Sequence, residues 1–363
     1  MPNFVPGLEL SRSFYHEAIR PILDAEYPGL RHSAALFGYG SDVLGYDTER
    51  STDHEWGPRA WLFLAADDLP AHHDRVRDTL AHRLPPRFLS YSTHFGESSQ
   101  ETGTATLAEP AAGPINHKVS VVSLEGFARD QFSLDAHAEP TAAVWLALPE
   151  QKLLELTAGA VFHDGLGTLA PLRARYTSYP EDVWRHRLAA QWQRLSQLEP
   201  FVGRTGEVTD DLGSALIAAS QVRDLMRLCF LIERRYAPYP KWFGTAFARL
   251  SCAPTLTPML TNVLRAGSWQ ERETHLTPVY QHVAVMHNAL GITPPLDPTV
   301  RPFFGRPFQV LVAGRFAEAI LATITDPAVR AIPDFYGAVD QLSDSTDLLS
   351  NPAVYPKLRP LYE

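Results

Sequence analysis

The sequence predicts an α+β N-terminal domain followed by a helical C-terminal domain. Runs typical of β-strands, such as AWLFLA at 60–65 and KVSVVSL at 118–124, occur in the N-terminal part. Towards the C-terminus these signals fade, and apolar residues recur at helical spacing. A length of 363 residues suits about two domains. We therefore expect domains at 1–140 and 141–363.

The N-terminal elements follow from turn signals and apolar spacing. Residues 11–27 predict a helix that Ser11 or Ser13 caps and that Pro28-Gly29 ends. The run SAALFGYGSD predicts a strand or helix end that leads into a tight glycine loop. The other expected elements are a buried strand at 60–65, a helix at 69–84, half-buried strands at 88–95 and 118–124, and a loop or flap at 97–116.

Four long segments predict the helices of the C-terminal domain: 142–162, 181–198, 211–235 and 278–292. In the second of them, Arg187, Gln191 and Arg194 share one helix face. This face either lines a cleft or is solvated. Cys229 and Cys252 are the only cysteines, and the apolar run around Cys229 predicts a free, buried thiol there.

Composition and charge exclude several function classes. A formal net charge of −9 gives no general attraction to nucleic acid or to an anionic membrane, so a phosphate-bearing ligand needs a local site. No stretch of about 18 apolar residues occurs, so no membrane span is expected. The start of the chain, MPNFVPGLELSRSF, lacks the basic and apolar regions of a signal peptide. We therefore expect a soluble, cytoplasmic protein.

The segment FGYGSDVLGYDTERSTDHEWGPRAWLFL, residues 37–64, carries the candidate chemistry. Gly40 and Ser41 lie in a loop whose backbone amides can approach a phosphate closely, because glycine adds no side chain. Asp53 and Glu55 follow in the same segment. In an extended backbone these two carboxylates point to the same side, which suits Mg²⁺. The alternative for the acid pair is a solvated strand end or a helix cap.

Two cations are candidate phosphate contacts. Arg59 follows the acid pair, and its alternative role is an ordinary surface ion pair. Lys241 follows prolines in YAPYPKW, where Tyr239 and Trp242 flank it, an arrangement that suits base stacking and a triphosphate contact. The alternative for Lys241 is a turn between helices that aromatic side chains pack. The predicted site residues are thus Asp53 and Glu55 as catalytic metal ligands and Gly40, Ser41, Arg59 and Lys241 as nucleotide contacts.

These motifs resemble those of the DNA polymerase β-like nucleotidyltransferases, in which Gly-Ser precedes Asp-x-Asp or Asp-x-Glu and a strand. The chain is more similar to the kanamycin nucleotidyltransferase branch, and most similar to bacterial proteins with a DUF4037 domain of unknown function. The closer resemblance rests on GYGSDVLG, STDHEWGPR, LLELTAGAVFHDGLGTLAPLR, YPEDVW, LAAQW and RRYAPYPKWFGTAF, within residues 30–250. It implies a nucleotidyltransferase-like mixed sheet with helices, and transfer of a nucleoside monophosphate from an NTP, with ATP expected.

The chain departs from the family pattern in three places. Residues 56–59, WGPR, separate the acid pair from the following strand. Ser120 stands where relatives commonly carry a third carboxylate. The glutamate base of the kanamycin branch aligns near Ala190 or Gln191, neither of which is a base. These departures bear on catalysis more than on nucleotide binding.

The favoured function is Mg²⁺-dependent transfer of a nucleoside monophosphate to a hydroxyl of a small molecule, at Asp53 and Glu55. One alternative is a non-catalytic nucleotide-binding or regulatory protein that kept the fold, which Ser120 favours. The other is a nucleotidyltransferase that acts on a macromolecule. The acidic composition does not favour nucleic acid, because binding there depends on neutralising phosphates. The acceptor, the base preference, the general base and the oligomeric state stay open.

Overall fold

The structure, a computed structural model, describes residues 4–97, 103–109, 113–333 and 335–363. The chain forms two compact units. The first comprises Met1–Glu139 and Lys152–Thr177, and the second comprises Pro140–Gln151 and Ser178–Glu363. The chain therefore leaves the first unit, returns to it once and leaves it again. The division expected from the sequence, 1–140 and 141–363, contains no such return.

A four-stranded mixed sheet forms the centre of the first unit. Its strands lie in the order β5 (Lys118–Val122), β2 (Arg59–Leu64), β1 (His32–Leu36) and β6 (Ala160–Asp164). β1 runs antiparallel to both β2 and β6, whereas β2 and β5 are parallel. The expected strands at 60–65 and 118–124 are therefore present as β2 and β5. The α+β class predicted from the sequence is confirmed.

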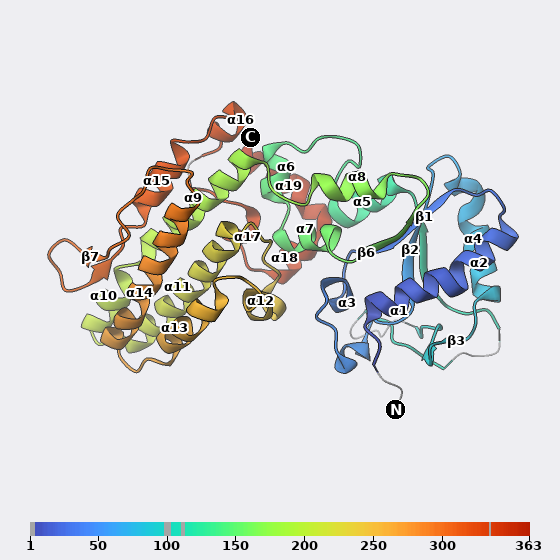
Figure 1. Cartoon of the computed structure of the whole chain (residues 1–363), viewed down its shortest axis with the longest axis horizontal. Coiled ribbons are helices and arrows are strands. Elements are labelled where there is room, and N and C mark those ends of the chain that lie inside the picture. Colours follow the sequence, from blue (N-terminus) through green and yellow to red (C-terminus); the bar gives the residue numbers. More distant parts are fainter. Residues whose placement is uncertain (1–3, 98–102, 110–112, 334) are drawn as a thin grey trace. The chain divides into compact units, whose positions relative to one another are not determined.

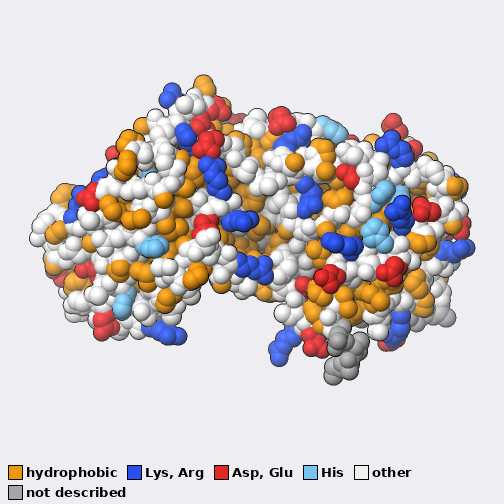
Figure 2. Space-filling view, in the orientation of Figure 1, with side chains coloured by type: hydrophobic (Ala, Val, Ile, Leu, Met, Phe, Trp, Pro, Cys, Tyr) orange, Lys and Arg blue, Asp and Glu red, His pale blue; other side chains and the backbone are white. Residues whose placement is uncertain are grey.

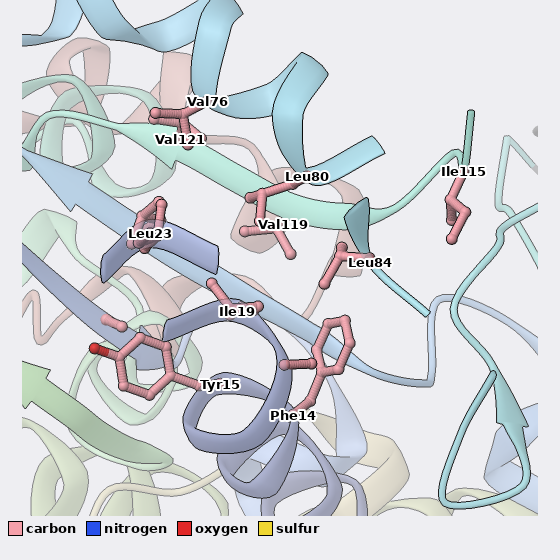
Figure 3. Packing of buried hydrophobic residues seen from close by; sticks show 14 of the residues in the cluster. Phe14, Tyr15, Ile19, Leu23, Val76, Leu80, Leu84, Ile115, Val119 and Val121 are labelled. Carbon is pink, nitrogen blue, oxygen red and sulfur yellow. The ribbon is translucent and has the colours of Figure 1, made fainter. Parts of the chain in front are cut away.

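Helices cover one face of this sheet (Figure 1). They are α1 (Gly7–Phe14), a π-helical turn η1 (Tyr15–Ile19), α2 (Arg20–Glu26) and α4 (Leu69–Arg83). Figure 3 shows Val76 and Leu80 of α4 against Val119 and Val121 of β5, with Ile19 of η1 nearby. Apolar residues at helical spacing meet the alternating inward residues of a strand, so both periodicities point into one core.

The first helix begins earlier than the sequence predicts. It starts at Gly7, after Pro6, and Ser11 lies inside it rather than at its N-cap. The Ser11 hydroxyl is buried and lies 3.5 Å from the Gly57 carbonyl oxygen, which it donates to. A serine inside a helix can therefore be kept for a tertiary hydrogen bond. The predicted stop is confirmed, because the helical stretch ends at Glu26.

The prediction of one helix over 142–162 is wrong. The structure contains α6 (Ala142–Ala147), α7 (Glu150–Thr157) and then the strand β6. Gly159 breaks the helix with φ +66°, and a Cβ there would lie 2.1 Å from the Leu36 carbonyl oxygen. β6 is a strand because β1 offers it an antiparallel partner, and a single-sequence pattern does not contain that partner.

The expected strand at 88–95 is a short hairpin. β3 (Arg87–Phe88) and β4 (Tyr91–Ser92) flank Leu89 and Ser90, whose φ angles are positive. The expected loop at 97–116 lies partly outside the described residues, and Leu107 in it bridges to Phe95. The remaining elements of this unit are α3 (Ser41–Leu44), the 3₁₀ turn η2 (Glu49–Asp53), α5 (Leu124–Phe132) and α8 (Leu169–Arg175).

The second unit is mainly helical. Six of its helices pack side by side in Figure 1: α9 (Glu181–Leu198), α10 (Phe201–Glu207), α11 (Asp211–Ile232), α13 (Ala253–Arg265), α14 (Trp269–Ala289) and α15 (Gly314–Leu321). Its other elements after α9 are α12 (Pro240–Phe247), β7 (Arg301–Pro302), β8 (Gln309–Val310), α16 (Pro327–Arg330), α17 (Val339–Leu342), α18 (Thr346–Ser350), η3 (Pro352–Val354), α19 (Tyr355–Leu358) and η4 (Arg359–Tyr362).

Two further predictions about this unit can be checked. The helices expected at 181–198 and 211–235 are α9 and α11, and the one expected at 278–292 begins earlier, as α14. Cys229 and Cys252 are both free and buried. Within the part of the chain that the structure describes, we find no helix with the length and apolar character needed to cross a membrane.

Candidate functional site

Three segments of the first unit meet at one edge of the sheet. β1 ends at this edge, and because β2 is antiparallel to β1 and parallel to β5, both β2 and β5 begin there. The loop after β1 therefore lies beside the first residues of β2 and β5, and Arg59 pairs in register with Lys118. We call this place the glycine-loop edge: residues 38–41, Glu55, Arg59 and Lys118.

Arg59 is held by a buried ion pair. Its Nη2 lies 2.7 Å from Asp42 Oδ1 and its Nε lies 3.2 Å from Asp42 Oδ2. Nη2 also donates to the Tyr39 carbonyl oxygen at 2.9 Å, and the guanidinium lies 5.0 Å from the centroid of the Tyr39 ring. Both charged side chains are almost fully buried. The ion pair expected as the alternative for Arg59 is present, but it is buried rather than exposed.

Gly40 permits this ion pair. Its φ is +129°, and a Cβ at this position would lie 2.2 Å from both Arg59 Nη2 and Asp42 Oδ1. The Gly38 N–H donates to the Glu155 carbonyl oxygen at 2.6 Å, and Ser41 begins α3. The loop conformation is thus determined by contacts within the protein, before any ligand binds.

Glu55 forms an ion pair with Lys118. The Lys118 Nζ lies 2.9 Å from Glu55 Oε2 and 3.2 Å from Oε1. The Ala105 N–H donates to Oε1 at 2.9 Å, and the Tyr39 hydroxyl donates to Oε2 at 3.4 Å. Partial burial opposes ionisation, but the Ala105 N–H and the Lys118 ammonium outweigh it and lower the pKa of Glu55.

Asp53 has different surroundings from Glu55. It ends the 3₁₀ turn η2, and its exposed carboxylate lies 2.8 Å from His54 Nδ1. Glu55 has φ +51°. The extended backbone expected over Asp53–Glu55 is therefore wrong: His54 is extended, but a helical turn precedes it and a left-handed residue follows it. A serine-threonine capping pair, Thr48 and Ser51, stabilises that turn.

As arranged, the two carboxylates do not form a Mg²⁺ site. Both oxygens of Glu55 already accept hydrogen bonds, two of them from an ammonium group, and Asp53 pairs with a histidine. Among the residues with described positions, no group of three or more His, Cys, Asp or Glu side chains is placed to hold a metal ion. The metal role of the pair therefore stays a prediction.

The structure brings four of the six predicted residues into this region as neighbours: Gly40, Ser41, Glu55 and Arg59. Asp53 lies two residues before Glu55 but faces its own partner. Lys241 belongs to the second unit. It is exposed in the first turn of α12, with its ammonium 5.0 Å from the centroid of the Trp242 ring.

Sequence reasoning missed Asp42, Lys118 and Tyr39 at this edge. Lys118 had one usable signal, because it directly precedes the alternating run VSVV, where a strand begins. Asp42 and Arg59 are separated by the whole acid-pair segment, so their pairing has no local signal. Ser120 lies on β5 opposite Trp61 of β2, as the neighbouring-strand prediction expected. It shares the strand face of Lys118, and the alternate residues Val119 and Val121 are buried.

Comparison with known proteins gives two matches. Residues 145–243 match the family model "Domain of unknown function (DUF4037)", which confirms the DUF4037 resemblance there. Among solved structures, the chain matches a nucleotidyltransferase-like protein from Exiguobacterium sibiricum 255-15, with 12% identity, 78% of this chain and 77% of that chain covered, and a TM-score of 0.34. A search of curated proteins finds no match. The kanamycin branch stays a prediction.

Proposed function

We propose that this chain, which carries a DUF4037 region at 145–243, binds the phosphate groups of a nucleotide at the glycine-loop edge of its first unit. The observation that carries the proposal is the pairing in register of two cations, Arg59 and Lys118, beside a bend that only glycine permits. The partly exposed ammonium of Lys118, close to a sharply turned backbone, suits a polyanionic group. ATP is the nucleotide that the sequence resemblance implies.

Each residue has a distinct role in this proposal. Gly40 leaves room for the Arg59–Asp42 ion pair beneath the loop, so the loop keeps the bend that faces the ligand. Arg59 is a positioning residue, because its ion pair with Asp42 holds the loop. Lys118 is partly exposed and exchanges Glu55 for phosphate when the nucleotide binds. Tyr39 is 40% exposed, and its ring offers a flat surface on which a base can stack.

Transfer of a nucleoside monophosphate to a hydroxyl of a small molecule is the first candidate activity. In that reaction the acceptor oxygen bonds to the α-phosphorus, the α–β phosphoanhydride bond breaks, and pyrophosphate leaves as the hydroxyl loses its proton. The family resemblance implies Mg²⁺ at Asp53 and Glu55, which would first have to leave His54 and Lys118. Nucleotide binding without transfer is the second candidate, and the Glu55–Lys118 ion pair favours it.

The test is calorimetric titration of the whole chain with a non-hydrolysable ATP analogue, with and without Mg²⁺. We expect Lys118→Met to weaken binding about tenfold or more, because a direct phosphate contact is lost. Lys357→Met is the matched control, since it removes an exposed lysine of the second unit. Lys118→Met should lower the free energy of unfolding by less than about 1 kcal/mol, because its ion pair is partly exposed.

Variants of the acid pair and of Lys241 separate the candidates. If Asp53→Asn abolishes binding only when Mg²⁺ is present, transfer gains support, and pyrophosphate release in an acceptor screen becomes the next measurement. If the affinity for the analogue changes neither on addition of Mg²⁺ nor in Asp53→Asn, nucleotide binding without transfer is supported. Lys241→Ala should weaken binding more than it lowers the melting temperature if Lys241 is a contact. No binding of ATP, GTP, CTP or UTP analogues to the native chain contradicts the proposal.

A further inference from the structure

The hairpin of β7 and β8 carries a large apolar side chain that is almost fully exposed. In Figure 1 this hairpin forms a loop at the left end of the helical unit, outside the helices. Phe304 lies at its tip and is 89% exposed. On the face that Figure 2 shows, hydrophobic side chains also reach the surface over these helices, between charged side chains of both signs. Phe304 therefore contributes almost nothing to the apolar core of its own unit.

Phe304 also adopts a backbone conformation that suits other residues better. The Arg306 N–H donates to the Phe303 carbonyl oxygen at 2.9 Å, which closes a four-residue turn. The two central residues, Phe304 and Gly305, have φ +49° and +75°. Positive φ at both positions is typical of a type I′ turn, which favours Asn-Gly, and a bulky side chain there is uncommon. A residue that weakens the fold of its own chain and stays exposed is typical of a binding site.

The base of the hairpin is fixed to the helices. Phe308 is buried, and the centroid of its ring lies 5.7 Å from that of Trp269 of α14. It packs so closely on Gly203 of α10 that a Cβ there would lie 2.3 Å from the ring. The Gln309 N–H donates to Glu273 Oε1 at 2.8 Å. A rigid base therefore presents the tip, so little conformational entropy is lost when the tip binds.

The charge of the hairpin is positive. Residues 301–310, RPFFGRPFQV, contain two arginines and no carboxylate. Arg301 Nη2 lies 2.9 Å from Asp297 Oδ2, so its charge is already paired. Arg306 is exposed, and its guanidinium forms no ion pair with any side chain whose position the structure describes. A surface that receives the tip should therefore combine apolar side chains with carboxylates.

The same unit exposes a surface of that kind where α10 leads into α11, and we call residues 207–216 the α10–α11 corner. Three apolar side chains of the corner are between 62% and 73% exposed: Val208, Leu212 and Leu216. Leu212 and Leu216 are four residues apart in α11 and share one helix face. The segment EVTDDL, 207–212, contains three carboxylates and no cation. Asp211 lies 4.0 Å from Arg272, whereas the exposed Glu207 forms no ion pair with a described residue.

We propose that two copies of this chain associate through these surfaces, with the hairpin tip of each copy on the α10–α11 corner of the other. The Phe304 ring packs on Leu212 and Leu216, and the Arg306 guanidinium pairs with Glu207. A second copy is the partner because the chain itself carries both complementary surfaces. Both surfaces adjoin α10, so one twofold axis can bring two identical contacts together. This association is independent of nucleotide binding in the first unit.

The test is sedimentation velocity of the full chain over a range of micromolar concentrations. We expect the native chain to form dimers and Phe304→Asn to weaken dimerisation about tenfold or more, because a central aromatic side chain is lost. The melting temperature of the Phe304→Asn monomer should equal or exceed that of the native monomer, because asparagine adopts positive φ more readily. A loss of association in this variant is then not a result of unfolding.

Leu89→Asn is the matched control. Leu89 is also an exposed apolar residue with positive φ, +45°, at the turn of a hairpin, but it belongs to the first unit. The same substitution should therefore relieve the same backbone conformation there and leave dimerisation unchanged.

Charge reversal tests the ion pair between the copies. Arg306→Glu and Glu207→Arg should each weaken dimerisation, because each places like charges together. The variant that carries both changes restores opposite charges and should dimerise more tightly than either single variant. A double variant that dimerises no more tightly than the single variants contradicts the pairing of Arg306 with the α10–α11 corner.

Other results would overturn the association of two copies. They are a native chain that stays monomeric throughout the micromolar range, dimers that Phe304→Asn leaves unchanged, and dimers that Leu89→Asn weakens as much as Phe304→Asn does. If the monomeric chain instead floats with phosphatidylserine vesicles and Phe304→Asn does not, the tip binds a membrane rather than a second copy. None of these results depends on whether the first unit binds a nucleotide.

Discussion

At the glycine-loop edge, the identity of a loop residue depends on the buried side chains that it contacts. Arg59 and Asp42 form a buried ion pair directly under Gly40, and Gly40 is a glycine because a side chain would collide with that pair. Breaking a buried pair by removing one partner is destabilising, because the other charge is left buried. The residues of the Gly-Tyr-Gly-Ser loop therefore serve stability as well as any ligand.

Replacement of Gly40 by alanine tests this contact. We expect Gly40→Ala to lower the free energy of unfolding by at least about 2 kcal/mol, because it adds a collision to an unfavourable backbone conformation. Gly45→Ala is the matched control: Gly45 also has a positive φ, but a Cβ added there would meet no atom within 4 Å. It should cost about 1 kcal/mol. Urea denaturation measures both values, and equal losses would contradict the contact.

At the scale of elements, β6 is the part of the chain whose structure depends most on a distant partner. It follows α7 after a short connection, and it pairs with β1, which lies more than a hundred residues earlier in the chain. Arg173 of α8 reinforces the connection by donating to the carbonyl oxygens of Thr157 and Ala158. The strand therefore exists only in the folded first unit.

Gly159 is the residue on which this turn depends. We expect Gly159→Ala to lower the thermal midpoint of the first unit far more than Gly167→Ala does. Both glycines have φ near +70°, but only at Gly159 would the Cβ meet a backbone oxygen, 2.1 Å away. The free energies of unfolding of the two variants should differ by at least about 1 kcal/mol. Calorimetric melting of the two variants gives the comparison, and similar melting curves would show that the turn tolerates a side chain.

For the whole molecule, the DUF4037 region at 145–243 does not coincide with a compact unit. Its residues 152–177 belong to the first unit and include β6, whereas α9, α11 and part of α12 belong to the second. A fragment limited to this region would contain β6 without β1. Stability and binding are therefore properties to measure on the full chain.

The pH dependence of stability is a further whole-chain property, and His287 contributes to it. Burial lowers the pKa of His287 to about 4. Between pH 6.5 and pH 4, the imidazole is therefore protonated in the unfolded chain but stays neutral in the folded protein. The stabilisation is present above pH 6.5 and is lost as the pH falls towards 4. Linkage over this range amounts to roughly 3 kcal/mol.

His287→Gln removes this titration. We expect its free energy of unfolding to fall less than that of the native chain between pH 7 and pH 4, as measured by denaturation at several pH values. His275→Gln, which removes another histidine of the same helix, is the control. Burial raises the pKa of Glu199 to about 7, and its effect has the opposite sign but is common to all three proteins. Parallel curves for the native chain and His287→Gln would contradict the assignment.

Sequence patterns predicted the elements with strong local signals. The strands β2 and β5 and the helices α4, α9 and α11 were predicted within a few residues, because their apolar residues recur clearly at strand or helix spacing. The run that forms β1 was predicted only as a strand or a helix end. The glycine loop was predicted from the glycines themselves, which favour tight turns. β6 and the hairpin β3–β4 were not, because their short runs take their conformation from a partner or from a turn.

The candidate site divides in the same way. The sequence by itself determines the residue types of the Gly-Ser and Asp-x-Glu motifs. It also determines the acidic composition, because of which a phosphate-bearing ligand needs a local site. The tertiary structure alone decided that Asp42 forms an ion pair with Arg59 and that Lys118 forms one with Glu55. It alone left Phe304 exposed at a hairpin tip of the second unit. Local order follows from neighbours along the chain, whereas the partner of a charge follows from the sheet and helix packing that brings distant residues together.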